Sequence, residues 1–292
     1  MLEELAELGF GYVELSHGIR MPLVPGIMDA VKDGVVKVSS THNFCPLPPG
    51  VPGAAPNLYQ PSAASLPQRV QWVRQTMRSL AFGGQMGAKV LVCHMGSLGF
   101  FFTDPSARLY RLGDSLDPAV RLDDVRYKHL LQKQLTRFRR MAGRAMDRVY
   151  EAVGQVAEAA LEHQIKIGVE NREGFTELPL DEDQQRAVDA MASLEMVGGW
   201  HDTGHARIKE QYGFIKHASL LEATSAGLLG FHLKDVDASG DEHLAMGEGT
   251  VDFDMVRSHF RPGQILVIEL GPKTKRDEVL RSRDFLYDLI AR

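Results

Sequence analysis

The segment IKIGVE, residues 165–170, decides the fold, because it is a short apolar run that ends on a carboxylate and lies between longer helical stretches. Six more runs of this kind are spread along the 292 residues: GYVELS (11–16), VKVSSTH (36–42), KVLVCH (89–94), MVGGWHD (196–202), LLGFHLK (228–234) and QILVIEL (264–270). Strands that alternate with helices build a parallel sheet with both faces covered. We therefore predict an α/β fold, a (β/α)8 TIM barrel, with its clearest helix from Asp124 to His163.

The N-terminal end of the chain departs from that plan. A (β/α)8 barrel has eight strands, whereas this chain opens on a helical pattern from Leu2 to Leu8 before the first of the seven runs. We expect that the first strand is missing or truncated at the N-terminus. A barrel left open at that edge is the alternative, and it would expose unpaired backbone groups. The length suits one barrel, so we expect a single domain over residues 1–292.

The bulk composition is that of a globular protein with a sizeable core. Hydrophobic residues make up 44% of the chain, charged residues 24%, and the formal net charge is −5. This acidic balance provides no overall attraction to nucleic acid, so we expect a small-molecule partner. The two cysteines, Cys45 and Cys93, are too few for a disulfide framework, and we find no secretory signal and no apolar run long enough to span a membrane. We expect a cytoplasmic protein that does not bind membranes.

Two long connections follow predicted strands. One covers residues 45–67 and is rich in Pro and Gly; the other covers residues 97–123 and contains Phe100, Phe101 and Phe102. Loops of this length are usually functional, and in a barrel they would overhang the active-site face. Three consecutive Phe residues are too apolar for an exposed loop. They indicate a substrate lid or, equally, a subunit interface, and so a possible homo-oligomer.

Polar residues recur at the ends of the predicted strands. Carboxylates and imidazoles lie at or next to the end of five runs and inside a sixth: Glu170, Asp202, Glu269, His42, His94 and, inside its run, His232. The strand ends of a barrel converge on one mouth, so we expect these side chains to become neighbours. Taken singly, each is more often a helix cap, an ion-pair partner or a hydrogen-bonded core residue. Their repeated placement favours a shared site.

The chemistry of this set favours a divalent metal ion. Buried carboxylates are costly unless they are paired or bind a metal, and several in one mouth would repel one another. A cation removes both penalties. Two glutamates, an aspartate and a histidine form a mostly oxygen ligand set that suits Mn, Mg, Co or Zn. We therefore predict a divalent cofactor.

Five segments, in this order, resemble those of the xylose isomerase-like TIM barrel superfamily, which contains sugar isomerases and epimerases, inosose-processing enzymes and type-IV apurinic endonucleases. The segments are VEN (169–171), HDTGH (201–205), HLKD (232–235), DEHLAMGEG (241–249) and IEL (268–270). The resemblance covers nearly the whole chain apart from the first strand and the two long loops. It identifies the superfamily but no single activity within it.

The ketose epimerase branch implies a metal held by Glu170, Asp202, His232 and Glu269. It also implies that Glu170 and Glu269 act as acid and base. A metal that bridges a carbonyl and the neighbouring hydroxyl acidifies the shared C–H, and two carboxylates can then move the proton.

The same branch implies a set of substrate contacts. His205 would contact substrate oxygens, and His94 could do the same. Lys234 directly follows the HL of HLKD and would help to neutralise an anionic substrate, with an exposed loop charge as its alternative. Glu14, on the first run, can also reach the mouth; a structural ion pair is an equally good interpretation of it.

The endonuclease branch fits a longer ligand list. Its trinuclear zinc cluster would add five possible ligands to the four above: His42, His94, His205, Asp241 and His243. Three clustered ions would supply a hydroxide for phosphodiester cleavage. DNA binding needs cationic loops, however, and the long loops here are rich in Pro, Gly and Phe. We therefore favour a metal-dependent isomerase, epimerase or dehydratase of a sugar, sugar phosphate or cyclitol, with a trinuclear-zinc phosphodiesterase as the alternative.

Overall fold

The computed structural model describes residues 1–100, 104–191 and 194–292, so Phe101 and Phe102 lie outside the described residues. The chain forms two compact units. The first comprises Met1–Gly96, Asp147–Glu170 and Val188–Trp200, and the second comprises Ser97–Met146, Asn171–Ala187 and His201–Arg292. The single domain over residues 1–292 stays a prediction.

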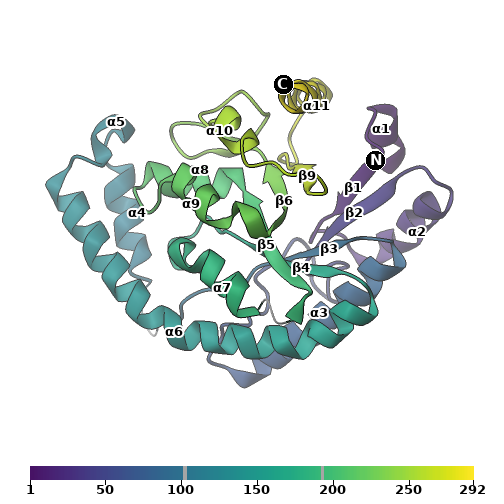
Figure 1. The fold of residues 1–292 in the computed structure, drawn as a ribbon, viewed down its shortest axis with the longest axis horizontal. Helices are drawn as coiled ribbons and strands as arrows, with labels where there is room; N and C mark the ends of the chain where they lie inside the picture. Colours follow the sequence, from purple (N-terminus) through teal and green to yellow (C-terminus); the bar gives the residue numbers. More distant parts are fainter. Residues whose placement is uncertain (101–103, 192–193) are drawn as a thin grey trace. The chain divides into compact units, whose positions relative to one another are not determined.

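The sheet of the first unit is parallel. In hydrogen-bonded order its strands are β1 (Tyr12–Leu15), β2 (Lys37–His42), β3 (Val90–Cys93), β4 (Lys166–Glu170) and the first residues of β5 (Val197–Asp202). β3, with the sequence VLVC, is buried at every position, as an apolar and partly β-branched run between two covered faces should be. β1 and β2 lie side by side (Figure 1). Helix α1 (Leu2–Glu7) precedes β1, and the helices between β1 and β3 are η1 (Met21–Leu23), α2 (Val24–Lys32) and α3 (Leu66–Gln85).

The second unit contains the last two residues of β5, followed in hydrogen-bonded order by β6 (Leu228–Leu233) and β9 (Ile265–Ile268). β6 and β9 are parallel, and Phe231 and Leu233 of β6 belong to an apolar core with Val256 and Leu286. Apart from helix α6 (Val125–Glu162), the helices that lie or begin in this unit are α4 (Ser106–Asp114), α5 (Pro118–Arg121), η2 (Asp181–Asp183), α7 (Gln184–Met191), α8 (Thr203–Gln211), α9 (His217–Thr224), η4 (Ser225–Gly227), α10 (Phe253–Arg257) and α11 (Arg276–Ala291).

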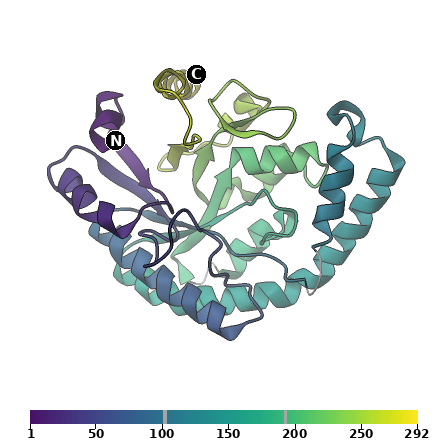
Figure 2. The ribbon, with the colours of Figure 1, turned by 180° about the vertical axis from the view of Figure 1, so that it is seen from behind.

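Helix α6 (Val125–Glu162) is one continuous helix with residues in both units (Figures 1 and 2). Its apolar residues recur at steps of three and four, and those at Phe138, Ala142, Ala145 and Val149 are buried. The helix predicted from Asp124 to His163 is therefore confirmed to within one residue at each end.

Each of the seven predicted apolar runs contains one of the seven parallel strands, so these assignments are confirmed. The helical pattern at Leu2 to Leu8 is α1. That a first strand has been lost stays a prediction.

A short antiparallel pair, β7 (Asp235–Val236) and β8 (Glu242–Leu244), was not predicted. The buried carboxylate of Asp235 organises the segment that follows it. At 2.9–3.0 Å it accepts hydrogen bonds from the backbone N–H groups of Val236, Gly247, Gly249 and Val251. A Cβ on Gly249 would lie 2.4 Å from Oδ1 of Asp235, so this close approach requires glycine.

Phe100 is the described member of the three-Phe run. Its ring lies edge to face with Phe138 of α6, with centroids 6.3 Å apart, and the guanidinium of Arg137 lies 5.2 Å from its centroid. The substrate lid and the subunit interface both stay predictions. Along the described parts of the chain, every helix is too short or too polar to cross a membrane.

Candidate metal and catalytic site

The first unit brings three predicted residues together at the ends of β2, β3 and β4. Nε2 of His94 lies 2.9 Å from Oε2 of Glu170, and Nε2 of His42 lies 3.7 Å from the same oxygen. The two imidazole rings meet edge to face with centroids 4.8 Å apart. All three side chains are buried, and their donor atoms are close enough to share one ion. Two imidazoles and a carboxylate form a ligand set typical of zinc and other transition metals.

Polar neighbours fix the orientation of both histidines. Nδ1 of His94 lies 2.9 Å from Oδ1 of Asn57, and Nδ1 of His42 lies 3.1 Å from the carbonyl oxygen of Asn43. A histidine whose second ring nitrogen is held in this way presents the first nitrogen in a defined direction, as metal-binding histidines do. A third histidine, His17, lies edge to face with His42 at 4.7 Å between centroids.

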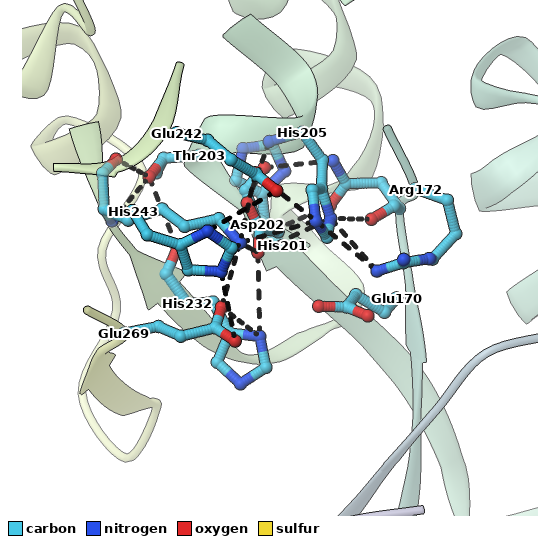
Figure 3. A network of polar contacts seen from close by, with 12 residues as sticks. Glu170, Arg172, His201, Asp202, Thr203, His205, His232, Glu242, His243 and Glu269 are labelled. Carbon is cyan, nitrogen blue, oxygen red and sulfur yellow. Dashed lines mark hydrogen bonds and ion pairs between the residues drawn. The ribbon is translucent and has the colours of Figure 1, made fainter. Parts of the chain in front are cut away.

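The second unit brings the other predicted ligands together at the ends of β5, β6 and β9 (Figure 3). Nδ1 of His232 lies 3.8 Å from Oδ2 of Asp202 and 3.5 Å from Oε2 of Glu269. Asp202 and His232 are fully buried, whereas the side chain of Glu269 is 29% exposed. Glu269 is therefore the member of this trio that solvent can reach.

Asp202 is held in place by Asn171 and by helix α8. The side-chain amide of Asn171 donates to the carbonyl oxygen of Asp202 at 3.0 Å, and Oδ1 of Asn171 accepts from the backbone N–H of Asp202 at 2.7 Å. Asp202 also caps α8, because its Oδ1 accepts from the backbone N–H of His205 at 2.8 Å. The other carboxylate oxygen, Oδ2, faces His232 and Lys234.

Lys234 is only 1% exposed, so its interpretation as an exposed loop charge is wrong. Its Nζ lies 2.9 Å from Oδ2 of Asp202, 3.0 Å from Oε2 of Glu269 and 3.4 Å from Oε2 of Glu242. Burial opposes the charge on Lys234, but the three nearby carboxylates outweigh that penalty and raise its pKa. The side chain is therefore a buried ammonium ion.

The donor atoms of Asp202, His232 and Glu269 can be compared with the spacing that a divalent ion needs. Ligand atoms that bind one ion at about 2.0–2.2 Å are roughly 3.0–3.6 Å apart. The distances of 3.5 and 3.8 Å from His232 to the two carboxylates are close to that range, but the ligand atoms of all three side chains do not lie within 4.8 Å of one another, so Glu269 would have to move toward Asp202 to share an ion with it. Glu170, the predicted fourth ligand, belongs to the first unit, so the complete set of four ligands stays a prediction.

A further group surrounds His205. The side chains of Glu173, His205 and Glu242 are close enough to share an ion, and Nε2 of His205 lies 3.9 Å from Oε2 of Glu242. Nη1 of Arg172 lies 3.3 Å from Nδ1 of His205. Burial, followed by the charge of Glu242, raises the pKa of Glu173 to about 7. A carboxyl group that titrates near neutrality can take up or release a proton during a reaction.

Three other predicted residues differ in their surroundings. Nε2 of His243 lies 3.3 Å from Nζ of Lys234, so His243 borders the acidic cluster. Asp241 is exposed, whereas its neighbour Glu242 faces the cluster. Glu242, and not Asp241, is therefore the acidic residue of this segment that contacts the cluster. In the first unit, Glu14 accepts a hydrogen bond from Oγ of Ser40 at 2.7 Å.

Several polar residues of these groups were not predicted from the sequence: His17, Asn57, Asn171, Arg172, Glu173 and Glu242. Four of them had a usable signal, because His17 follows β1 closely and Asn171, Arg172 and Glu173 directly follow β4. Asn57 lies in a long Pro- and Gly-rich loop, where no sequence pattern indicates which side chain turns inward.

Comparison with known proteins adds the family context. A family model described as a xylose isomerase-like TIM barrel matches residues 2–289. With the parallel strand order, this match confirms the predicted α/β TIM barrel fold. Among curated proteins, the uncharacterized protein MJ1311 of Methanocaldococcus jannaschii is 26% identical over 148 residues. That alignment covers 50% of this chain and 49% of MJ1311, so the chain spans about half the length of this relative.

Several solved structures share the fold over nearly the whole chain. A D-tagatose 3-epimerase-like protein has a TM-score of 0.68 at 18% identity, covering 99% of this chain and 91% of its own. The 3-keto-D-glucoside 4-epimerase YcjR from E. coli has a TM-score of 0.63 at 16% identity, and the match covers 100% of this chain and 93% of YcjR. D-psicose 3-epimerase from Clostridium cellulolyticum H10 has a TM-score of 0.63 at 11% identity, and the match covers 99% of this chain and 91% of the epimerase.

Proposed function

This chain belongs to the xylose isomerase-like TIM barrel family, and on that premise we propose that it is a metal-dependent isomerase or epimerase that moves a proton next to the carbonyl of a sugar or related polyol. The observation that carries the proposal is the cluster of Asp202, His232 and Glu269, in which one imidazole lies within 3.8 Å of two carboxylates at the ends of three parallel strands.

Glu170, Asp202, His232 and Glu269 would hold the metal. When bound, a divalent ion of this type, Mn, Mg, Co or Zn, polarises a substrate carbonyl and stabilises the charge that develops on its oxygen. The ligand chemistry in the second unit supports this role, since its two carboxylates gather around a cation even without a metal, namely the ammonium of Lys234.

Glu170 and Glu269 are the proposed acid and base. Glu269 is suited to exchange a proton with substrate because its side chain is 29% exposed and its Oε2 is held by Lys234 at 3.0 Å. Glu170 is buried and is held by His94 at 2.9 Å, which keeps its carboxylate in one orientation. When two carboxylates are held in fixed orientations, one can remove a proton from one face of a carbon and the other can return a proton to the opposite face.

The substrate class is a small polyhydroxylated carbonyl compound. D-tagatose, D-psicose and 3-keto-D-glucosides are the compounds in the names of the structurally similar proteins. Ketose phosphates and the keto forms of cyclitols carry the same pair of a carbonyl and a neighbouring hydroxyl group. His205, His94 and Glu14 are the proposed contacts to substrate hydroxyls. We expect a cytoplasmic enzyme that does not bind nucleic acid.

A trinuclear-zinc phosphodiesterase is the second candidate. Two groups outside the main trio favour it, because His42, His94 and Glu170 in the first unit and Glu173, His205 and Glu242 in the second could each hold an ion. Metal analysis of the purified protein separates the two functions. About one ion per chain is expected for the isomerase and about three for the phosphodiesterase.

Solvent exchange tests the proposed reaction. The protein, supplied with MnCl2, is incubated in deuterium oxide with D-tagatose, D-psicose, D-fructose or a 3-keto-glucoside, and the sugars are then followed by proton NMR after removal of the metal. We expect deuterium at the carbon next to the carbonyl of at least one sugar, and exchange that is slower by about 10²-fold or more in the Glu269→Gln variant. Exchange that is equally fast in that variant would contradict the assignment, and a complete lack of exchange with every sugar in the wild type would contradict the proposed function.

A further inference from the structure

Lys234 is built into the acidic cluster of the second unit by the HDTGH segment. Oγ1 of Thr203 donates to the carbonyl oxygen of Lys234 at 2.8 Å and accepts from its backbone N–H at 3.1 Å. Gly204 leaves room for the lysine stem, since a Cβ at that position would lie 2.8 Å from Cε of Lys234. The segment thus fixes both the backbone and the path of this side chain.

The ammonium group of Lys234 contacts the carboxylates that a metal would use. Nζ lies 2.9 Å from Oδ2 of Asp202 and 3.0 Å from Oε2 of Glu269. The same two oxygens face Nδ1 of His232 at 3.8 and 3.5 Å, and these three side chains belong to the proposed metal ligands. Lysine and metal would therefore neutralise the same pair of carboxylates.

We infer that Lys234 is the internal cation of this cluster and competes with a divalent metal for Asp202 and Glu269. Two cations that share both oxygens would lie within a few ångströms and repel each other. Metal binding therefore requires Nζ to leave at least one of these oxygens. Glu242 offers it another partner, because Oε2 of Glu242 lies 3.4 Å from Nζ.

Two consequences follow from this competition. Lys234 lowers the affinity of the cluster for metal, because the ion must displace an ammonium group that already has partners. Lys234 also stabilises the metal-free protein, because buried carboxylates without a cation are strongly destabilising. The inference shares the metal site with the proposed function but does not depend on which substrate the protein uses.

The variant Lys234→Met tests the inference, because methionine keeps much of the stem and removes the charge. Metal-free protein is titrated with MnCl2 by isothermal titration calorimetry near neutral pH, and its melting temperature is measured with and without MnCl2. We expect the dissociation constant for Mn²⁺ to fall by about tenfold or more. We also expect the melting temperature without metal to fall, and Mn²⁺ to restore it.

Lys209→Met is the matched control. Lys209 is also only 1% exposed, and its Nζ lies 2.7 Å from Oδ2 of Asp181, away from the acidic cluster. This variant should melt at a lower temperature than the wild type but bind Mn²⁺ with unchanged affinity. Binding by Lys234→Met that is equal to or weaker than that of the wild type would overturn the inference, as would a lack of Mn²⁺ binding by both proteins.

A Lys234→Met protein that folds only when Mn²⁺ is present supports the inference. If it folds under neither condition, the test uses NMR of wild-type protein with ¹⁵N-labelled lysine. The slowly exchanging ammonium signal of Lys234 should shift as zinc is added. An unchanged signal would overturn the inference. Lys209→Met assigns that signal, because Lys209 and Lys234 are the two buried lysines among the described residues. Tighter Mn²⁺ binding by Lys234→Met without exchange of any sugar would support the inference and contradict the proposed function.

Discussion

Nε2 of His94 lies 2.9 Å from Oε2 of Glu170, while the other nitrogen of the same ring lies 2.9 Å from Oδ1 of Asn57. This chain of contacts fixes the Glu170 carboxylate in the interior of the first unit. We predict that Glu170→Gln and Glu269→Gln each lower turnover by about 10²–10⁴-fold, because an amide cannot exchange the proton that a carboxylate exchanges.

Both variants should keep the fold, since the amide has nearly the shape of the carboxylate. Steady-state kinetics and circular dichroism measure the two properties separately. Glu162→Gln is the control, because Glu162 is exposed near the end of α6 and its replacement should leave turnover unchanged. Full activity in both Glu170→Gln and Glu269→Gln would refute their roles.

Asp235 should be a major determinant of stability in the second unit. Asp235→Ala leaves the backbone N–H groups of Val236, Gly247, Gly249 and Val251 without their carboxylate acceptor. We expect the free energy of unfolding to fall by about 3–5 kcal/mol, as measured by urea denaturation, since several hydrogen bonds to a buried charge are lost together.

Asp241→Ala is the matched comparison for that prediction. Asp241 is exposed on the same segment, so its loss should change stability by no more than about 0.5 kcal/mol. A similar loss in the two alanine variants would show that the hydrogen bonds of Asp235 do not organise the segment.

A buried histidine pair predicts acid sensitivity. Nε2 of His217 lies 2.9 Å from Nε2 of His201, and burial lowers the pKa of His217 from its usual 6.5 to about 4. The unfolded chain therefore binds more protons than the folded protein between these values, so stability is full above about pH 6.5 and falls as the pH drops toward 4. The loss over this range is about 3 kcal/mol.

Urea denaturation at several pH values tests this prediction. His217→Gln should flatten the fall in stability across the range, whereas His129→Gln, on the exposed side of α6, should leave the slope unchanged. An unaltered slope in His217→Gln would mean that other groups cause the acid sensitivity.

Much of the scaffold was predictable because each strand of the parallel sheet is marked by an apolar run. The polar residues at the strand ends were predictable for the same reason, as Glu170 and Asp202 are the last residues of β4 and β5. Periodicity carries this information because it reflects burial on both faces of a parallel strand.

The details beyond the strands could not be predicted from periodicity. Asp241 and Glu242 are adjacent acids, and which one turns inward depends on an irregular two-stranded segment in which His243 has a positive φ of 64°. Lys234 directly follows β6, and its burial depends on the room left by Gly204, far away in the sequence. Both outcomes are set by tertiary contacts.

We propose that one divalent ion is held jointly by Glu170, Asp202, His232 and Glu269. Anomalous diffraction at the manganese edge from crystals grown with MnCl2 tests it most directly. We predict a strong anomalous peak within coordination distance of all four side chains. A manganese peak bound by other residues, or no peak at these four in protein that binds Mn²⁺ in solution, would contradict the account.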